Sequence, residues 1–121
     1  MTYQHAKAYC ESDNAVLATP RSEEENKFIA GLLPSNNIWI GVDDLVKNKI
    51  WISAASGEEI TYSNWRQGEP TYTWRGKDEN CVQILSKQGT WNDIRCEYEL
   101  KFACIYDIAS KIIYNSIKSF Q

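Results

Sequence analysis

Apolar residues near the start of the chain follow a helical period. Between Tyr3 and Cys10, the apolar positions Ala6, Tyr9 and Cys10 fall on one face of a helix, so we predict a helix over 3–10. The apolar run at 16–19 that follows is short and ends at a proline, which favours a strand. The chain therefore opens with a helix and a strand.

A second helix is predicted over residues 22–29. Ser22 can cap its first turn, and Glu25, three residues later, can complete a capping box. Gly31 and Pro34 are typical of the end of a helix, so we expect the helix to stop there.

The pattern then changes to short apolar runs separated by polar loops. The predicted strands are 38–42, 50–52, 60–62, 82–85 and 101–105. Helices followed by strands indicate an α+β fold and not alternating α/β units. The stretch between Tyr62 and Cys81 is rich in Gly, Pro, Asn and charge without a clear period, and loops of that length in compact domains are usually functional.

Length and charge narrow the classes of protein. A chain of 121 residues suits one domain, since a second core would lack material. The net charge is −3 and no basic run could follow a phosphate backbone, so we expect no nucleic acid partner. Apolar runs are only a few residues long, far from the roughly 20 that cross a bilayer, so we expect no membrane insertion.

Four cysteines without a C-x-x-C pair favour disulfides over a zinc site, and the only histidine, His5, is expected at the surface. Four cysteines allow three pairings, which the spacing leaves open. Disulfides imply an oxidising compartment, so we expect a secreted or extracellular protein. Residues 1–7 lack the apolar core of a secretion signal, so we expect a processed or recombinant form.

Oxygen-bearing side chains gather in four short segments around the long polar stretch. These segments are 43–44, 69–71, 78–80 and 91–93. Carboxylate, amide and hydroxyl oxygens are hard donors that suit calcium, which takes six to eight of them. A single such segment is usually a solvated loop, so calcium binding requires that several of them converge.

Several motifs of this chain resemble the C-type lectin domain in order and spacing. They are Trp-Ile-Gly at 39–41, Gly-Glu-Pro at 68–70, Glu-Asn-Cys-Val at 79–82, Trp-Asn-Asp at 91–93, and the cysteines Cys96 and Cys104. Residues 17–26 and 61–65 are similar to the collectins in particular. The resemblance implies a domain core over residues 1–106.

The C-type lectin fold that this resemblance implies has two helices flanking small antiparallel sheets, a long binding loop and two disulfides. The pairs would be Cys10 with Cys104 and Cys81 with Cys96. The Glu69–Pro70 peptide would be cis, as it is in the family.

The resemblance also implies calcium-dependent binding of carbohydrate. The calcium ligands would be Glu69, Thr71, Glu79, Asn92 and Asp93, and the sugar would contact Glu69, Thr71, Glu79, Asn92 and Trp74. Trp91 would pack beneath the site. Paired carboxylates could serve acid and base roles in glycoside hydrolysis, but a calcium ion that holds both leaves neither free, so we expect no enzyme.

Sugar preference rests on Glu69, Thr71 and Trp74. The resemblance links Glu69 to the equatorial vicinal hydroxyls of mannose, fucose or N-acetylglucosamine, although Thr71 stands where mannose-type members usually carry Asn. Trp74 favours the alternative, galactose or N-acetylgalactosamine, whose apolar face stacks on an aromatic ring in relatives. A protein-binding or ice-binding module of the same fold is a further alternative. Because single sugar sites bind weakly, a homo-oligomer would raise the affinity.

A second, auxiliary calcium site occurs in many relatives. Here it would involve Asp44, Asn48 and Asn80. Asn48 and Tyr72 stand at positions that are acidic in the collectins, so we expect this site to be weak or empty, with Asp43 as a partial substitute.

Residues 107–121 follow the strand that normally ends the fold. Family members normally begin with a strand that pairs with that last strand, and residues 111–118 are similar to it. We therefore hypothesise a circular permutation, with 107–110 as the joint. The alternatives are an appended amphipathic helix that uses Ile108, Ile112 and Ile117, and strand exchange between two chains.

Overall fold

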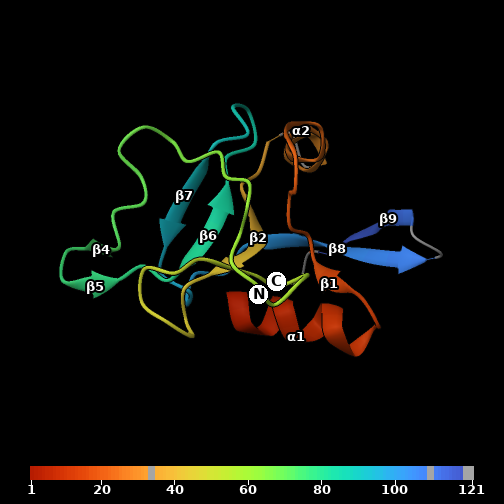
Figure 1. Cartoon of the computed structure of the whole chain (residues 1–121), viewed down its shortest axis with the longest axis horizontal. Helices are drawn as coiled ribbons and strands as arrows, with labels where there is room; N and C mark the ends of the chain where they lie inside the picture. The colour runs from red at the N-terminus through yellow and green to blue at the C-terminus, as the bar shows by residue number, and fades with distance from the viewer. Residues whose placement is uncertain (33–34, 109–110, 119–121) are drawn as a thin grey trace.

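The computed structural model describes residues 1–32, 35–108 and 111–118. The prediction that Pro34 helps to end the second helix lies outside the described residues. Two helices lie on either side of a twisted sheet, with α1 below and α2 above it, and a small hairpin projects from the opposite end to the long β8–β9 ribbon (Figure 1). This is the α+β arrangement that the sequence predicts.

The elements begin with α1 (Tyr3–Ser12), β1 (Val16–Leu17) and α2 (Glu23–Gly31). The strands that follow are β2 (Ile38–Asp43), β3 (Ile52–Ser53), β4 (Thr73–Trp74), β5 (Lys77–Asp78), β6 (Cys81–Ile84), β7 (Trp91–Ile94), β8 (Lys101–Ile108) and β9 (Lys111–Lys118).

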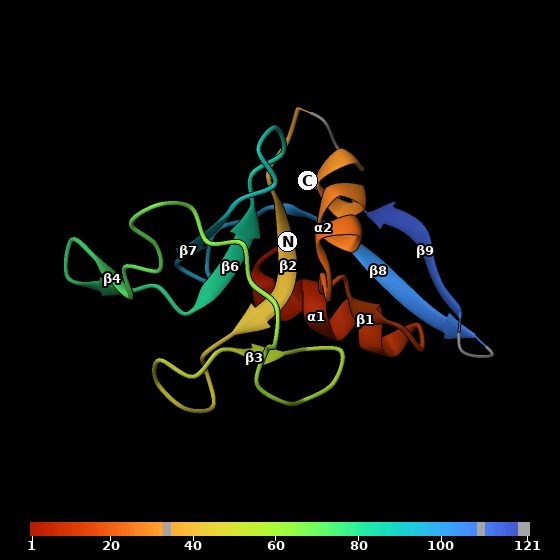
Figure 2. The same ribbon diagram turned by 45° about the horizontal axis from the view of Figure 1, so that its top comes forward.

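The main sheet runs in the order β1-β8-β2-β6-β7, with β3 paired to β2 and β9 paired to β8. The β2–β8 pair is parallel and the other pairs are antiparallel. β4 and β5 form a separate two-stranded sheet. Because β7 is the edge strand, with β6 next to it, the loops that leave these two strands lie at that side of the sheet (Figure 2).

The core is aromatic at its centre. Trp39 on β2 and Trp91 on β7 are fully buried, as the resemblance implies for Trp91. The Tyr3 ring meets Trp39 edge-on at 5.5 Å between centroids, and its hydroxyl donates to the Asp43 carboxylate at 2.7 Å. α1 is thereby fixed against the strand whose end carries Asp43 and Asp44.

The start of α2 follows the sequence in one respect and differs in another. Ser22 caps the helix, because its hydroxyl accepts from the Glu25 backbone N–H at 3.2 Å. The Glu25 carboxylate does not return to Ser22 as a capping box would, but accepts from the backbone N–H and the guanidinium of Arg21. Arg21 thus takes the place that the backbone N–H of Ser22 would have as donor to Glu25 in a capping box.

Two disulfides join Cys10 to Cys104 and Cys81 to Cys96, as the resemblance implies. The first ties α1 to β8 across 94 residues, and the second joins the start of β6 to the segment after β7. The Glu69–Pro70 peptide is cis. The second disulfide thus holds the end of the long loop, where β6 begins, close to the segment that follows β7.

The observed elements differ from the predicted ones at several points, and the predicted strand at 50–52 is observed as β3 (Ile52–Ser53). Residues 60–62 form no strand but an irregular segment, in which Tyr62 packs its ring edge-on against Trp91. The strands β4, β5 and β7 were not predicted. Residues 111–118 form β9, which pairs antiparallel with β8, so the alternative of an appended helix is wrong for these residues. The circular permutation stays a prediction.

Candidate functional site

The long loop contains a hairpin that brings two predicted calcium ligands to its base. β4 and β5 pair Thr73 with Asp78 and Trp74 with Lys77. The two turn residues, Arg75 and Gly76, have φ values of 52° and 75°, which matches the two left-handed residues of a tight hairpin turn. Below these pairs, the Glu79 N–H donates to the Tyr72 carbonyl at 2.8 Å. The hairpin therefore returns the chain from Thr71 to Glu79.

Three carboxylates meet at the hydroxyl of Thr71. The hydroxyl oxygen lies 2.7 Å from Glu79 Oε1, 3.2 Å from Asp93 Oδ1 and 3.3 Å from Glu69 Oε1. Since a hydroxyl has only one proton to donate, it satisfies one of these acceptors at a time. Four of the five predicted calcium ligands thus lie together in the structure.

Asp93 is the innermost of these groups. It is fully buried on β7, and two successive backbone N–H groups of the long loop donate to it. Thr71 N–H reaches Oδ1 at 3.0 Å and Tyr72 N–H reaches Oδ2 at 2.6 Å. These bonds anchor the loop to the sheet and give a buried carboxylate two backbone hydrogen-bond donors.

Burial, with a smaller contribution from neighbouring acids, raises the pKa of two side chains. Burial is the largest cause of the rise in the pKa of Glu69 to about 7, and the hydrogen bond and the charge of Asp93 add to it. Burial also raises the pKa of Glu79, although its hydrogen bond from Thr71 opposes the shift. Both carboxylates therefore lie where their negative charge is poorly compensated by the protein.

The donor set fits a calcium ion. Among the described residues, the three acids form no ion pair, and a divalent cation would compensate their charge. All four groups are hard oxygen donors, as calcium requires. Within the part of the chain that the structure describes, no three His, Cys, Asp or Glu side chains by themselves form a metal site, and the Thr71 hydroxyl hydrogen-bonds to Glu79 among the acids.

Asn92 and Trp74 stand apart from this group. Asn92 precedes Asp93 on β7 and is half-buried, and its amide makes no hydrogen bond to the other four side chains in the described part of the molecule. Trp74 lies on the hairpin with 57% of its surface exposed, and the Arg75 guanidinium lies 5.5 Å from its ring centroid. One cation therefore already contacts the ring on which a sugar would stack.

The residues of the predicted auxiliary site bond directly to one another. Asp44 is buried, and it accepts from the Asn80 amide at 2.8 Å and from the Lys49 N–H at 2.9 Å. Asn48 is exposed in the same loop. Asp43, the suggested substitute, is engaged with Tyr3 and with the Leu45 N–H at 3.1 Å. Both aspartates thus have protein donors on their oxygens.

An open hollow of about 620 Å³ is lined in part by Asp78 and Asn80, the two residues that flank Glu79 in the chain. Its lining is polar apart from one aromatic ring and comprises Lys77, Asp78, Asn80, Arg95, Glu97 and Tyr98. The Arg95 guanidinium lies over the Tyr98 ring and donates to its hydroxyl at 2.8 Å. The hollow is therefore a polar surface next to the segment that carries Glu79, and none of the five predicted calcium ligands lines it.

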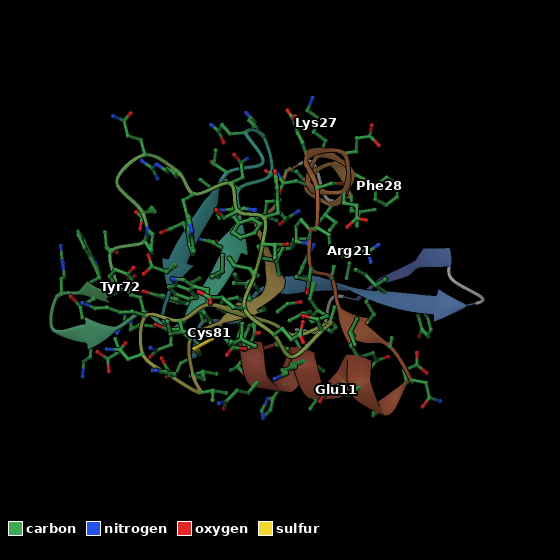
Figure 3. All side chains as sticks on the ribbon, in the orientation of Figure 1. Glu11, Arg21, Lys27, Phe28, Tyr72 and Cys81 are labelled. Atoms are coloured by element: carbon green, nitrogen blue, oxygen red, sulfur yellow. A yellow bond between two sulfur atoms is a disulfide. The ribbon has the colours of Figure 1, made fainter. Side chains whose placement is uncertain are left out.

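Sequence reasoning missed two residues that shape the site. Asn26 of α2 is buried and bonds Trp91 Nε1 and the Gly89 carbonyl, both at 2.7 Å, which fixes the turn before β7. Lys49 lies with its ammonium 5.1 Å from the Tyr72 ring centroid, beside the loop that carries Thr71 (Figure 3 labels Tyr72). The sequence signal for Asn26 is that a polar residue stands on the face of α2 that is otherwise apolar. The histidine of the chain, His5, is exposed on α1, as expected.

Comparison with known proteins identifies the family of this chain. Residues 1–106 match the family described as "Lectin C-type domain". Collectin-11 of Danio rerio is 31% identical over 108 residues, which cover 87% of this chain and 39% of that protein. The chain thus spans about two fifths of the length of this relative.

Two solved structures are similar in fold. The C-type carbohydrate-recognition domain of cow CD23, determined in the presence of a GlcNAc2Man3 oligosaccharide, has a TM-score of 0.77 and 33% identity, covering 86% of this chain and 78% of that one. A calcium-independent type II antifreeze protein has a TM-score of 0.74 and 25% identity, covering 86% and 77%.

The chain belongs to the C-type lectin domain family. This family consists in general of carbohydrate-binding modules that bind calcium and are not enzymes. Among the described helices, none combines the length and the apolar character needed to span a bilayer.

Proposed function

We propose that this domain binds carbohydrate through one calcium ion held by Glu69, Thr71, Glu79, Asn92 and Asp93. The observation that carries the proposal is the convergence of three carboxylates on the Thr71 hydroxyl, at 2.7 to 3.3 Å, without an ion pair among the described residues. Calcium binding would compensate the charge of Glu69, whose pKa is raised chiefly by burial and further by Asp93.

Glu69, Glu79 and Asn92 would each bind calcium and also form a hydrogen bond to the sugar. Calcium, when bound, supplies coordination positions for two vicinal sugar hydroxyls. The carboxylates of Glu69 and Glu79 accept hydrogen bonds from those hydroxyls, and the Asn92 amide donates one. Asp93, held by the N–H groups of Thr71 and Tyr72, fixes the loop to the sheet while this happens.

The favoured ligands are mannose, fucose and N-acetylglucosamine. Glu69 precedes the cis peptide bond to Pro70. Along the chain, the hydrogen-bond acceptor Glu69 therefore comes before the possible donor Thr71, which is the order of the Glu-Pro motif. Thr71 is an exposed hydroxyl that can donate to a sugar oxygen as an amide can, although it reaches less far. The oligosaccharide present with the similar cow CD23 domain contains mannose and N-acetylglucosamine, which supports this choice.

Galactose or N-acetylgalactosamine is the second candidate because Trp74 is largely exposed. The apolar face of a galactose ring could stack on its indole. Arg75 lies over that ring, so the stack would form on the surface that the guanidinium leaves open.

Protein or ice recognition without calcium is a third candidate, which the similarity to a calcium-independent antifreeze protein favours. The retained acids favour the lectin reading, because a calcium-free surface has no need of three crowded carboxylates.

The decisive experiment is a glycan array probed with the domain in calcium and again with a chelator. We expect mannose-type glycans to be bound in calcium alone, and Glu79→Gln to lower calcium affinity at least tenfold in calorimetry, because a ligand charge is lost. Glu99→Gln, an exposed acid outside the site, is the matched control.

Binding that survives the chelator would refute the calcium mechanism and support the third candidate. A preference for galactose that Trp74→Ala abolishes, with calcium affinity unchanged, would favour the second candidate over the first.

We further propose that the domain acts outside the cell and within a larger, multivalent assembly. The two disulfides suit an oxidising compartment. A single sugar site binds weakly, and the similarity to a collectin favours repetition of the site in a homo-oligomer.

A further inference from the structure

Tyr72 has an unusual backbone conformation next to the candidate site. Its φ of 67° lies in the left-handed region, which residues with side chains seldom adopt unless their surroundings hold them there. In this conformation its N–H donates to Asp93 and its carbonyl accepts from the Glu79 N–H. One peptide segment thus contacts two of the calcium-binding acids.

The Tyr72 ring is held by two partners outside the long loop. It stacks on Trp51 with 6.1 Å between centroids and 21° between planes. Trp51 is buried, and its indole N–H has no hydrogen-bond partner among the described residues, so ring contacts hold this side chain. The second partner is the Lys49 ammonium, 5.1 Å from the Tyr72 centroid.

The position of Lys49 is itself fixed by the sheet. Its backbone N–H donates to Asp44, which also accepts from Asn80, the residue after Glu79. A chain of contacts therefore leads from the end of β2 through Asp44, Lys49 and the Tyr72 ring to the backbone bonds on Asp93 and Glu79.

We propose that Lys49 and Trp51 hold the ring of Tyr72 as a brace that positions Asp93 and Glu79 for calcium, so that a lysine ammonium stabilises this side of the loop. Lys49 and Tyr72 are positioning residues and not calcium ligands. The proposal rests on the proposed calcium-binding function, and it adds the residues that set the geometry of that site.

The charge of Lys49 allows two roles of this residue to be distinguished: holding the Tyr72 ring, or only lying near the calcium site. A lysine that merely lies close repels calcium, so its removal would strengthen calcium binding. A lysine that holds the Tyr72 ring contributes a cation–π contact, so its removal would weaken calcium binding despite the lost repulsion. The two roles predict opposite signs.

The test measures calcium affinity by calorimetry and the exchange of the Tyr72 and Glu79 amide protons in the metal-free domain by NMR. We expect Lys49→Met to weaken calcium binding about two- to fivefold and to speed exchange of both amides. Lys49→Arg and Tyr72→Phe should resemble the wild type. Lys47→Met, which removes the same charge from the same loop without a ring contact, should bind calcium at least as tightly as the wild type.

The double variant Lys49→Met with Tyr72→Leu should bind calcium no more weakly than Tyr72→Leu alone, because Lys49 acts through the ring. Calcium binding by Lys49→Met that equals or exceeds that of the wild type, with unchanged amide exchange, would overturn the brace. If the wild type binds no calcium, the proposed function fails, and amide exchange still decides whether the brace exists.

Discussion

At the scale of single residues, three acidic side chains share the one proton of the Thr71 hydroxyl. The hydroxyl is closest to Glu79, at 2.7 Å, while Glu69 and Asp93 lie beyond 3.1 Å from it. Two carboxylates are thus left without a full bond from this hydroxyl, and burial together with Asp93 raises the pKa of Glu69 to about 7.

This pKa predicts how the metal-free domain responds to pH. The folded-state pKa of Glu69, about 7, exceeds its ordinary value of 4.5, so the folded state takes up a proton that the unfolded state does not yet bind. The metal-free domain should therefore gain stability from this residue as the pH falls from 8 to about 5. Thermal unfolding in a chelator should show a smaller gain for Glu69→Gln than for the wild type.

With saturating calcium the sign should reverse, because calcium requires the deprotonated carboxylate. Equal pH dependence of wild type and Glu69→Gln in the chelator would contradict the assignment of the raised pKa to this residue.

Site residues that belong to a sequence motif could be predicted, whereas contacts that depend on the path of a loop could not. Glu69, Thr71, Glu79 and Asp93 belong to motifs whose order is visible in the sequence. The contact between Lys49 and Tyr72 depends on the path of two loops with no period, and nothing in either segment indicates it.

At the scale of elements, α2 supports the site from a distance. Asn26 joins the helix to the turn before β7 by donating to the Gly89 carbonyl and accepting from Trp91 Nε1. β7 then carries Asn92 and Asp93 to the site. α2 thus fixes the strand that carries two of the proposed calcium ligands.

We expect Asn26→Ala to lower the free energy of unfolding by about 1–3 kcal/mol, because the buried Trp91 N–H loses its acceptor. Urea unfolding of the metal-free domain measures this change, with Asn36→Ala, whose amide bonds the neighbouring Ser35 at the surface, as control. Calcium affinity should fall as well, since the strand that holds Asp93 loosens. Stability equal to that of the control would show that α2 does not support β7 in this way.

The elements that escaped prediction share a physical cause. β4 and β5 have two residues each, too few for any alternation to be seen. β7 has Asn92 and Asp93 at its centre, so its polarity resembles that of a loop, and only pairing with β6 makes it a strand. In contrast, β2 and β6 are apolar runs and were predicted within one residue.

At the scale of the whole molecule, β8 joins distant parts of the chain. Its pairing with β9 runs from Ile108 opposite Lys111 to Phe102 opposite Lys118. Just before β8, the Leu100 N–H donates to the Met1 carbonyl at 2.9 Å, and the Met1 ammonium donates to the Leu100 carbonyl at 3.1 Å. Met1 thus pairs with Leu100, which lies two residues before Phe102, where the pairing of β8 with β9 ends.

This register makes the circular permutation testable. We predict that a variant in which residues 109–121 are moved in front of Met1 keeps the fold. β9 would still pair with the same edge of β8, but its connection would lead to Met1 and no longer come from the end of β8. Its calcium affinity and its unfolding temperature should match those of the original order.

Sedimentation supplies the control for strand exchange, since both orders should be monomers if β9 pairs within its own chain. An unfolded rearranged chain, or a dimer in which β9 pairs with a second copy, would contradict the permutation.

The Cys10–Cys104 bond has a further consequence for the exposed hairpin. Any single cut of the backbone between these two cysteines leaves both fragments in one covalent molecule. A protease that cleaves after Arg75 or Lys77 would thus separate Thr71 from Glu79 along the chain while the fragments remain tethered. Damage to the binding loop would leave the mass under non-reducing conditions almost unchanged, so a nicked domain would be detected only after reduction.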